Sequence, residues 1–102
     1  MNKRDLLDNA KSALVGYLNE NVKAVAVGWD PKTGNLILRY YLSRPATDDD
    51  VEMCSCAITE IIALFWKETV TAKDECVYTQ EPIANLEALD GFVYVREGGE
   101  NA

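Results

Sequence analysis

The clearest pattern of polar and hydrophobic positions in the chain runs from Thr47 to Lys67. Thr47 stands before three aspartates, Asp48 to Asp50, and this spacing lets Thr47 and Asp50 cap each other's backbone amides at the start of a helix. The three carboxylates also lie at the positive end of the helix dipole. Hydrophobic residues then recur at the i, i+3, i+4, i+7 spacing of a helix with one buried side: Val51, Cys54, Ile58, Ile61, Ile62 and Phe65. We therefore predict a central helix here.

A second helix is predicted near the N-terminus, beginning at Asn2 or Asp5. Gly16 weakens this helix, and the polar segment 19–21 is expected to end it. Its buried stripe would consist of Leu6, Ala10, Ala13, Leu14, Tyr17 and Leu18.

Alternating residues on both sides of a turn predict a β-hairpin. Val22–Trp29 and Leu36–Ser43 alternate with the period of two that is typical of strands. Between them, residues 30–35 combine a proline that presets one backbone dihedral with a Gly-Asn pair that tolerates positive φ. Pro45 then ends the second strand and leads the chain to Thr47.

Two more strands are predicted after the central helix, around Asp74–Thr79 and over Phe92–Arg96. Residues 68–73 are either a strand or a connector, and Asn85–Leu89 is expected to form one short helical turn. The element order is then α-β-β-α-β-β, in a single α+β domain over residues 1–102 with 98–102 as a frayed tail. Two successive hairpin-like pairs favour a four-stranded, mainly antiparallel sheet with both helices packed on one face.

This arrangement places one face of the sheet under the helices and leaves the other face uncovered. The helices would pack on Val25, Val27, Leu38, Tyr40, Val93 and Val95. An uncovered apolar face usually marks a contact site, although the first helix or the second chain of a homodimer is an alternative cover. The residues expected on it are Ala24, Ala26, Gly28, Ile37, Arg39, Tyr41, Phe92, Tyr94 and Arg96.

The chain carries a net charge of −7, which is distributed unevenly. Residues 1–46 contain seven Lys and Arg against four Asp and Glu, whereas residues 47–102 contain three against thirteen. A second half with a net charge of −10 repels nucleic acid and anionic membranes and attracts a basic protein. The alternative is an acidic solvated surface that only maintains solubility.

The sequence lacks the residues of the common catalytic and metal sites. It has no histidine, which is the usual general base. Its three cysteines, Cys54, Cys56 and Cys76, are an odd number that fits reduced thiols in a cytoplasmic protein. Cys54 and Cys56 would point in different directions on a helix, so we expect no metal ion and no cofactor. We also expect no signal peptide and no membrane-spanning segment.

Two further function classes remain as alternatives. A hydrolase would need Glu60, Asp74 and Glu75 to converge, and nothing in the sequence singles these residues out, so we predict no catalytic residues and no enzyme. The acidic second half opposes phosphate binding, so we also predict no direct contact with nucleic acid. A binder of single-stranded nucleic acid would use a stacking surface on the open sheet face, formed by Arg39, Tyr41, Phe92, Tyr94 and Arg96.

In size, charge and lack of catalytic residues, the chain resembles the small immunity proteins of bacterial toxin–immunity systems, of the contact-dependent growth inhibition and colicin kind. The resemblance is carried by the acidic helix start at 47–50 and by the closing segments 81–83 and 86–97. It implies a non-catalytic inhibitor that binds and neutralises a cognate toxin domain, a basic nuclease, one-to-one. Nuclease clefts are basic because they hold phosphates, and carboxylates dock to such clefts fast by electrostatic steering.

The residues expected to contact this partner follow from their chemistry. Carboxylates beyond the central helix would meet basic residues of the toxin, and exposed aromatic side chains would anchor the interface. Core packing is the alternative for each aromatic residue, and the alternative function is a homodimeric adaptor or structural module that uses the uncovered sheet face. The predicted partner-binding residues are Asp74, Glu75, Glu81, Glu87, Asp90, Trp29, Tyr41, Trp66 and Tyr78.

Overall fold

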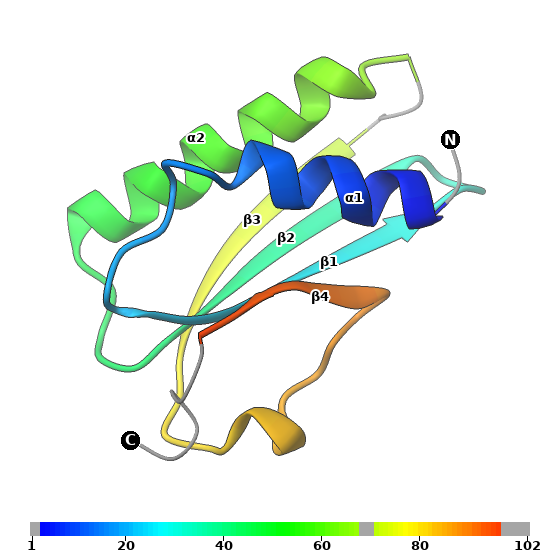
Figure 1. Cartoon of the computed structure of the whole chain (residues 1–102). Coiled ribbons are helices and arrows are strands. Elements are labelled where there is room, and N and C mark those ends of the chain that lie inside the picture. The colour runs from blue at the N-terminus through cyan, green and yellow to red at the C-terminus, as the bar shows by residue number, and fades with distance from the viewer. Residues whose placement is uncertain (1–2, 68–70, 97–102) are drawn as a thin grey trace.

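Two α-helices and a four-stranded sheet make up the fold in a computed structural model, which describes residues 3–67 and 71–96 (Figure 1). The predicted α-β-β-α-β-β order is confirmed, with one 3-10 turn before the last strand. The predicted tail at 98–102 lies outside the described residues. The elements are α1 (Lys3–Ala13), β1 (Val22–Asp30), β2 (Asn35–Leu42), α2 (Asp48–Leu64), β3 (Thr71–Tyr78), η1 (Ile83–Asn85) and β4 (Gly91–Val95).

The capped start of α2 is confirmed. The Asp50 amide donates to Thr47 Oγ1 at 3.2 Å, and the Thr47 amide donates to Asp50 Oδ2 at 3.0 Å, which is a complete capping box. The helix ends at Leu64, three residues earlier than predicted, where the Phe65 amide donates to the Ile62 carbonyl. Its buried side carries Cys54, Ile58 and Ile61 of the predicted stripe, with Ile62 and Phe65 partly buried, whereas Val51 is 49% exposed, contrary to the prediction.

The first helix is shorter than its apolar stripe suggested. It ends at Ala13, and Gly16 follows in the left-handed region at φ +92°, which turns the chain away from the helix axis. Leu14 is nevertheless buried, and Tyr17 and Leu18 pack against the same core. The stripe therefore continues through a turn that is not helical.

The predicted hairpin is confirmed as β1 and β2. The two strands pair antiparallel, with Val27 opposite Leu38 and Asp30 opposite Asn35 next to the turn. Gly34 has φ +74° and donates its amide to the Asp30 carbonyl at 2.8 Å, so the turn depends on the glycine there.

The sheet is mixed, with two antiparallel strand pairs and one parallel pair, and β3 and β4 do not form the expected second hairpin. The strand order is β3-β2-β1-β4, so β3 and β4 occupy opposite edges. β1 pairs antiparallel with both β2 and β4, whereas β2 pairs parallel with β3. The cause is the position of α2, because a strand–helix–strand unit that stays in one sheet gives a parallel pair. β3 begins at Thr71, and the preceding residues 68–70 lie outside the described part of the chain.

One large core cluster contains residues of both helices and of the sheet. Side chains of α1 and α2 pack there with alternate residues of β1 and β2. Tyr40 lies fully buried in it, and its hydroxyl donates to the Tyr17 carbonyl at 2.8 Å. Members of the cluster include Leu6, Ala10, Leu14, Val25, Val27, Leu38, Tyr40, Cys54, Ala57, Ile58, Ile61 and Val93.

The opposite side of the sheet is covered, which contradicts the prediction of an uncovered face. A second buried cluster lies on this side and packs against residues of the β3–β4 connection, including Leu86 and Leu89. It consists of Ala24, Ala26 and Tyr41. The connection passes below the sheet in Figure 1, with η1 at its lowest point. It turns back at Leu89, whose φ is +55°. Since this connection is part of the same chain, no dimer partner is needed to bury the face.

An irregularity in the β1–β4 pairing places Tyr94 and Val95 on the opposite faces of the sheet from those predicted. Val25 lies opposite Tyr94 and Ala24 opposite Val95, with a register shift before Ala26 and Phe92. Tyr94 therefore packs against the helix-side core, whereas Val95 is exposed, the reverse of the prediction. A shift of one residue moves each following side chain to the other face of a strand.

Candidate protein-binding surface

Two of the predicted partner-binding acids, Glu75 and Glu87, form ion pairs with Arg39 of the same chain. Arg39 Nη2 lies 3.1 Å from Glu75 Oε1, and Nη1 lies 2.8 Å from Glu87 Oε1. Nη1 also donates to the Tyr41 hydroxyl at 3.3 Å, and that hydroxyl donates to the Glu87 carbonyl at 2.7 Å. The hydrogen bonds to Tyr41 and Glu87, and then those to Glu75, raise the pKa of Arg39. We call Arg39, Tyr41, Glu75 and Glu87 the Arg39 cluster; it fastens the β3–β4 connection to the sheet.

Asp90 is also engaged inside the molecule. Its Oδ1 lies 2.7 Å from Lys3 Nζ, and its Oδ2 accepts the Trp29 amide at 2.6 Å. Burial raises the pKa of Asp90, but the hydrogen bonds from Lys3 and Trp29 outweigh this effect and hold it below the usual value. Asp90 thus connects α1, β1 and the start of β4, and its charge is largely compensated.

The remaining two predicted acids differ in exposure. Glu81 is exposed and accepts from Asn85 Nδ2 at 3.3 Å, while its carbonyl accepts from the Lys23 ammonium. Asp74 is half-buried on β3, opposite Leu38. Glu60, the other member of the hydrolase alternative, lies on α2 next to Tyr17, whereas Glu75 belongs to the Arg39 cluster. The three carboxylates of that alternative therefore do not converge.

The four predicted aromatic residues separate into two buried and two exposed side chains. Trp29 and Tyr41 are only 7% and 4% exposed, so the core-packing alternative applies to both. Trp66 is 67% exposed just beyond α2, with the Lys67 ammonium 5.4 Å from its ring centre. Tyr78 is 45% exposed at the end of β3. Only Trp66 and Tyr78 present enough surface to anchor a partner.

A group of exposed carboxylates on α2 was not among the partner-binding residues predicted from the sequence. Asp48, Asp49, Glu52 and Glu60 are exposed, and none of them forms an ion pair with another described residue. No lysine or arginine occurs between Asp48 and Leu64 to compensate them. We call these four residues the outer α2 carboxylates. Their positions away from the apolar stripe follow from the helical period, but the sequence pattern indicates Asp48 and Asp49 only as charges at the positive end of the helix dipole.

Asp50 differs from its neighbours because it points into the protein. It is 3% exposed and accepts hydrogen bonds from Asn19 Nδ2 at 2.8 Å and Asn21 Nδ2 at 3.0 Å, in addition to the Thr47 amide. The bond from the Thr47 amide, followed by the one from Asn19, lowers the pKa of Asp50 to about 2. Asp50 joins the start of α2 to the segment before β1 and is unavailable to a partner.

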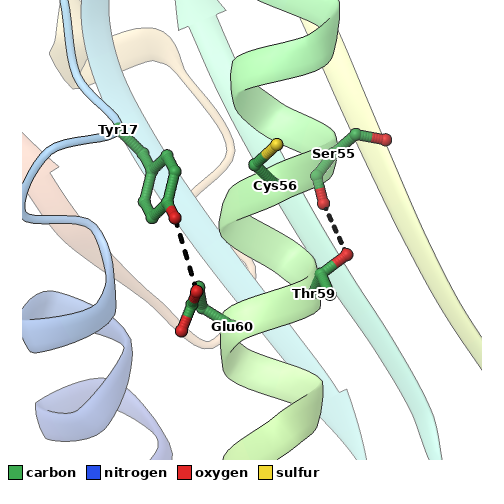
Figure 2. A pocket seen from close by; sticks show the side chains of 5 residues that line it. All are labelled: Tyr17, Ser55, Cys56, Thr59 and Glu60. Atoms are coloured by element: carbon green, nitrogen blue, oxygen red, sulfur yellow. Dashed lines mark hydrogen bonds between the residues drawn. The ribbon is translucent and has the colours of Figure 1, made fainter.

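A hollow of about 260 Å³ adjoins the outer α2 carboxylates at Glu60 (Figure 2). Tyr17 and Glu60 point toward each other in Figure 2, and the Tyr17 hydroxyl donates to Glu60 Oε1 at 3.4 Å. Ser55, Cys56 and Thr59 of α2 complete the lining. The charge of Glu60, followed by burial, raises the pKa of Tyr17, so the tyrosine remains a neutral donor.

The described residues, 3–67 and 71–96, contain no group of three or more Asp, Glu or Cys side chains arranged to hold a metal ion. All three thiols are free, with Cys54 buried and Cys56 exposed. Among the same residues, no helix is both long enough and apolar enough to cross a lipid bilayer.

These observations define a small α+β protein that presents an acidic helix on its surface. The family model of the MafI2 immunity protein matches residues 3–98. The chain therefore belongs to the MafI2 immunity protein family, and its resemblance to toxin-system immunity proteins is confirmed. Family membership gives the chain a toxin-immunity role and implies a cognate toxin as its partner. No curated protein matches the sequence.

Proposed function

We propose that this MafI2-family protein is a non-catalytic inhibitor that binds one cognate toxin domain, a basic nuclease, one-to-one in the cytoplasm. The family match supports the immunity role. The nuclease target rests on charge, because a carboxylate-rich helix complements the basic cleft that holds phosphates. We also take both helices to pack on one face of the sheet, in keeping with their shared core cluster.

We assign the contact surface to the outer α2 carboxylates, with Trp66 beyond the end of the helix as the aromatic anchor. One observation carries this assignment: the four carboxylates are exposed and make no ion pair with another described residue, whereas Glu75, Glu87 and Asp90 have cations beside them. A carboxylate that already has a cation contributes less to long-range steering than one without. Tyr78, Glu81 and Asp74 remain secondary candidates for the rim of the interface.

The test compares two triple variants with the same change in net charge. One is Asp48→Asn, Asp49→Asn, Glu52→Gln on α2; the control is Asp8→Asn, Glu20→Gln, Asp30→Asn, which neutralises exposed acids elsewhere. The binding probe is the purified toxin domain encoded by the neighbouring gene.

We expect the association rate constant, measured by stopped flow at low salt, to fall roughly tenfold for the α2 variant and less than about threefold for the control. The wild-type rate should also fall as salt is added. Equal rates for both variants, or a wild-type rate that is independent of salt, would contradict α2 as the contact surface. Stoichiometric loss of nuclease activity in the same mixture tests the nuclease target.

A further inference from the structure

We infer that the hollow between Tyr17 and Glu60 receives one arginine side chain of the toxin. This inference deepens the proposed function and rests on it. Part of the acidic surface is then not only a source of long-range steering but also a specific site for an arginine guanidinium group. Arginine is one of the residues that are enriched at the hot spots of protein interfaces.

Both sides of the hollow are held in place by contacts in the core. On one side, Tyr17 follows the left-handed turn at Gly16, its amide donates to the Leu14 carbonyl at 2.8 Å, and its carbonyl accepts the buried Tyr40 hydroxyl at 2.8 Å. On the other side, the Glu60 backbone belongs to α2 and is followed by the fully buried Ile61. A hollow that is fixed before binding loses little conformational entropy when it is filled.

The charge inside the hollow lacks a cation. Glu60 Oε1 accepts only the long hydrogen bond from Tyr17, and the carboxylate forms no ion pair within residues 3–67 and 71–96. The carboxylate therefore has acceptor capacity left for a charged donor. A bound cation would compensate the negative charge that now acts on the Tyr17 hydroxyl.

The shape and chemistry of the hollow fit a guanidinium group. At about 260 Å³ it is smaller than pockets for drug-sized ligands, which begin at about 300 Å³. It offers one carboxylate and one aromatic ring, while the Thr59 hydroxyl already donates to the Ser55 carbonyl at 2.9 Å. Arginine can use these features together, since it binds carboxylates through two parallel donors and stacks on aromatic faces. Lysine would use only the charge.

The experiment measures the affinity of the cognate toxin domain for Glu60→Gln, with Glu20→Gln as the matched control outside the assigned contact surface. Both glutamates are exposed, and only Glu60 lines the hollow. We expect Glu60→Gln to raise Kd by tenfold or more and Glu20→Gln to raise it by less than about threefold. Unchanged urea midpoints for both variants show that folding is intact.

Two chemical probes report on the hollow itself. Cys56 lines it and is exposed, whereas Cys54 is buried, so iodoacetamide alkylation of Cys56 should slow at least tenfold in the complex. Phenylglyoxal labelling, read by mass spectrometry, should show one toxin arginine that is protected by wild type and regains reactivity with Glu60→Gln.

The possible results separate the inference from the proposed function. Tight binding of Glu60→Gln together with fast alkylation of Cys56 in the complex would overturn the hollow as a contact site and leave the proposed inhibitor intact. Protection of a toxin lysine instead of an arginine would overturn the assignment to arginine. Failure of the wild type to bind the toxin domain at all would overturn the inference and the proposed function together.

Discussion

The two glutamates of the Arg39 cluster and the outer α2 carboxylates carry the same negative charge but have opposite surroundings. Glu75 and Glu87 lie within 3.1 Å of the Arg39 guanidinium and hold the β3–β4 connection on the sheet. The outer α2 carboxylates face solvent and make no ion pair with another described residue. A count of acidic residues along the sequence treats both groups alike. The comparison teaches that the net charge of a region overstates what a partner can use, because ion pairs within the protein consume part of it.

Asp50 provides the strongest test of the comparison, since it lies on α2 and yet is buried and accepts hydrogen bonds within the protein. Asp50→Ala removes the capping box and the acceptor for two asparagine amides, one of which belongs to the buried Asn21. We expect the free energy of unfolding in urea to fall by about 3 kcal/mol. The neighbouring Asp48→Asn should stay within about 0.5 kcal/mol of wild type. Equal losses in the two variants would show that the carboxylates of α2 do not divide into structural and free groups.

Arg39→Met tests the role of the Arg39 cluster. The replacement keeps an apolar stem but leaves Glu87 without its cation and Glu75 with only the Lys73 ammonium at 4.0 Å, and the Arg39 side chain is only 18% exposed. We expect the free energy of unfolding to fall by about 2 kcal/mol. Proteolysis within residues 79–90 should also accelerate as the connection loosens. Under conditions where the variant is folded, the toxin association rate should remain that of wild type; a tenfold slower rate would place the Arg39 cluster in the interface.

The pH dependence of stability isolates the buried carboxylate from the exposed ones. Because folding lowers the pKa of Asp50 to about 2, its contribution is fully present above its unfolded pKa near 4 and is lost as the pH falls through 2. We expect the stability difference between wild type and Asp50→Asn to shrink by on the order of 1–2 kcal/mol between about pH 4 and pH 2. Urea titrations at several pH values measure this. A difference that stays constant over that range would mean that Asp50 titrates normally.

Gly16→Ala has the smallest expected effect and tests how firmly Tyr17 is placed beside α2. An added Cβ would meet no atom within 4 Å, so the cost comes only from the positive φ of +92°. We expect a loss of about 1 kcal/mol in the free energy of unfolding. Val15→Ala, at an exposed neighbouring position, should change it by less than about 0.5 kcal/mol. An unchanged stability for Gly16→Ala would indicate that the turn tolerates a different backbone conformation.

The elements that depend on local pattern were predicted correctly from the sequence. Thr47 and Asp50 form the expected capping box, and the β1–β2 hairpin forms around the expected turn. These features involve residues close together in the chain, so helical spacing, strand alternation and turn residues are sufficient to identify them. The immunity class also followed from size, charge and the residues that carry the resemblance, and the family match confirms it.

Apart from the early ends of the two helices, the main errors in the fold concern contacts between residues far apart in the sequence. Local pattern could not show that β3 pairs parallel with β2 at the sheet edge opposite β4, or that residues 79–90 cover Tyr41. The irregularity at Val25 that turns Tyr94 inward has no sequence signal of its own. For the candidate site, the exposure of Trp66 and the burial of Trp29 were equally open, because each tryptophan ends an apolar stretch directly before a charged residue.

The sequence by itself determined the order of the elements, the capped central helix and the excess of acidic residues, because each is a property of short stretches of chain. Only the tertiary structure decided which carboxylates are free. Arg39 and Lys3 come from the basic first half and neutralise acids of the second half across 36 to 87 positions, Glu75, Glu87 and Asp90 among them. Charge acts through distance in space, so its effect on a partner is fixed only when the chain has folded.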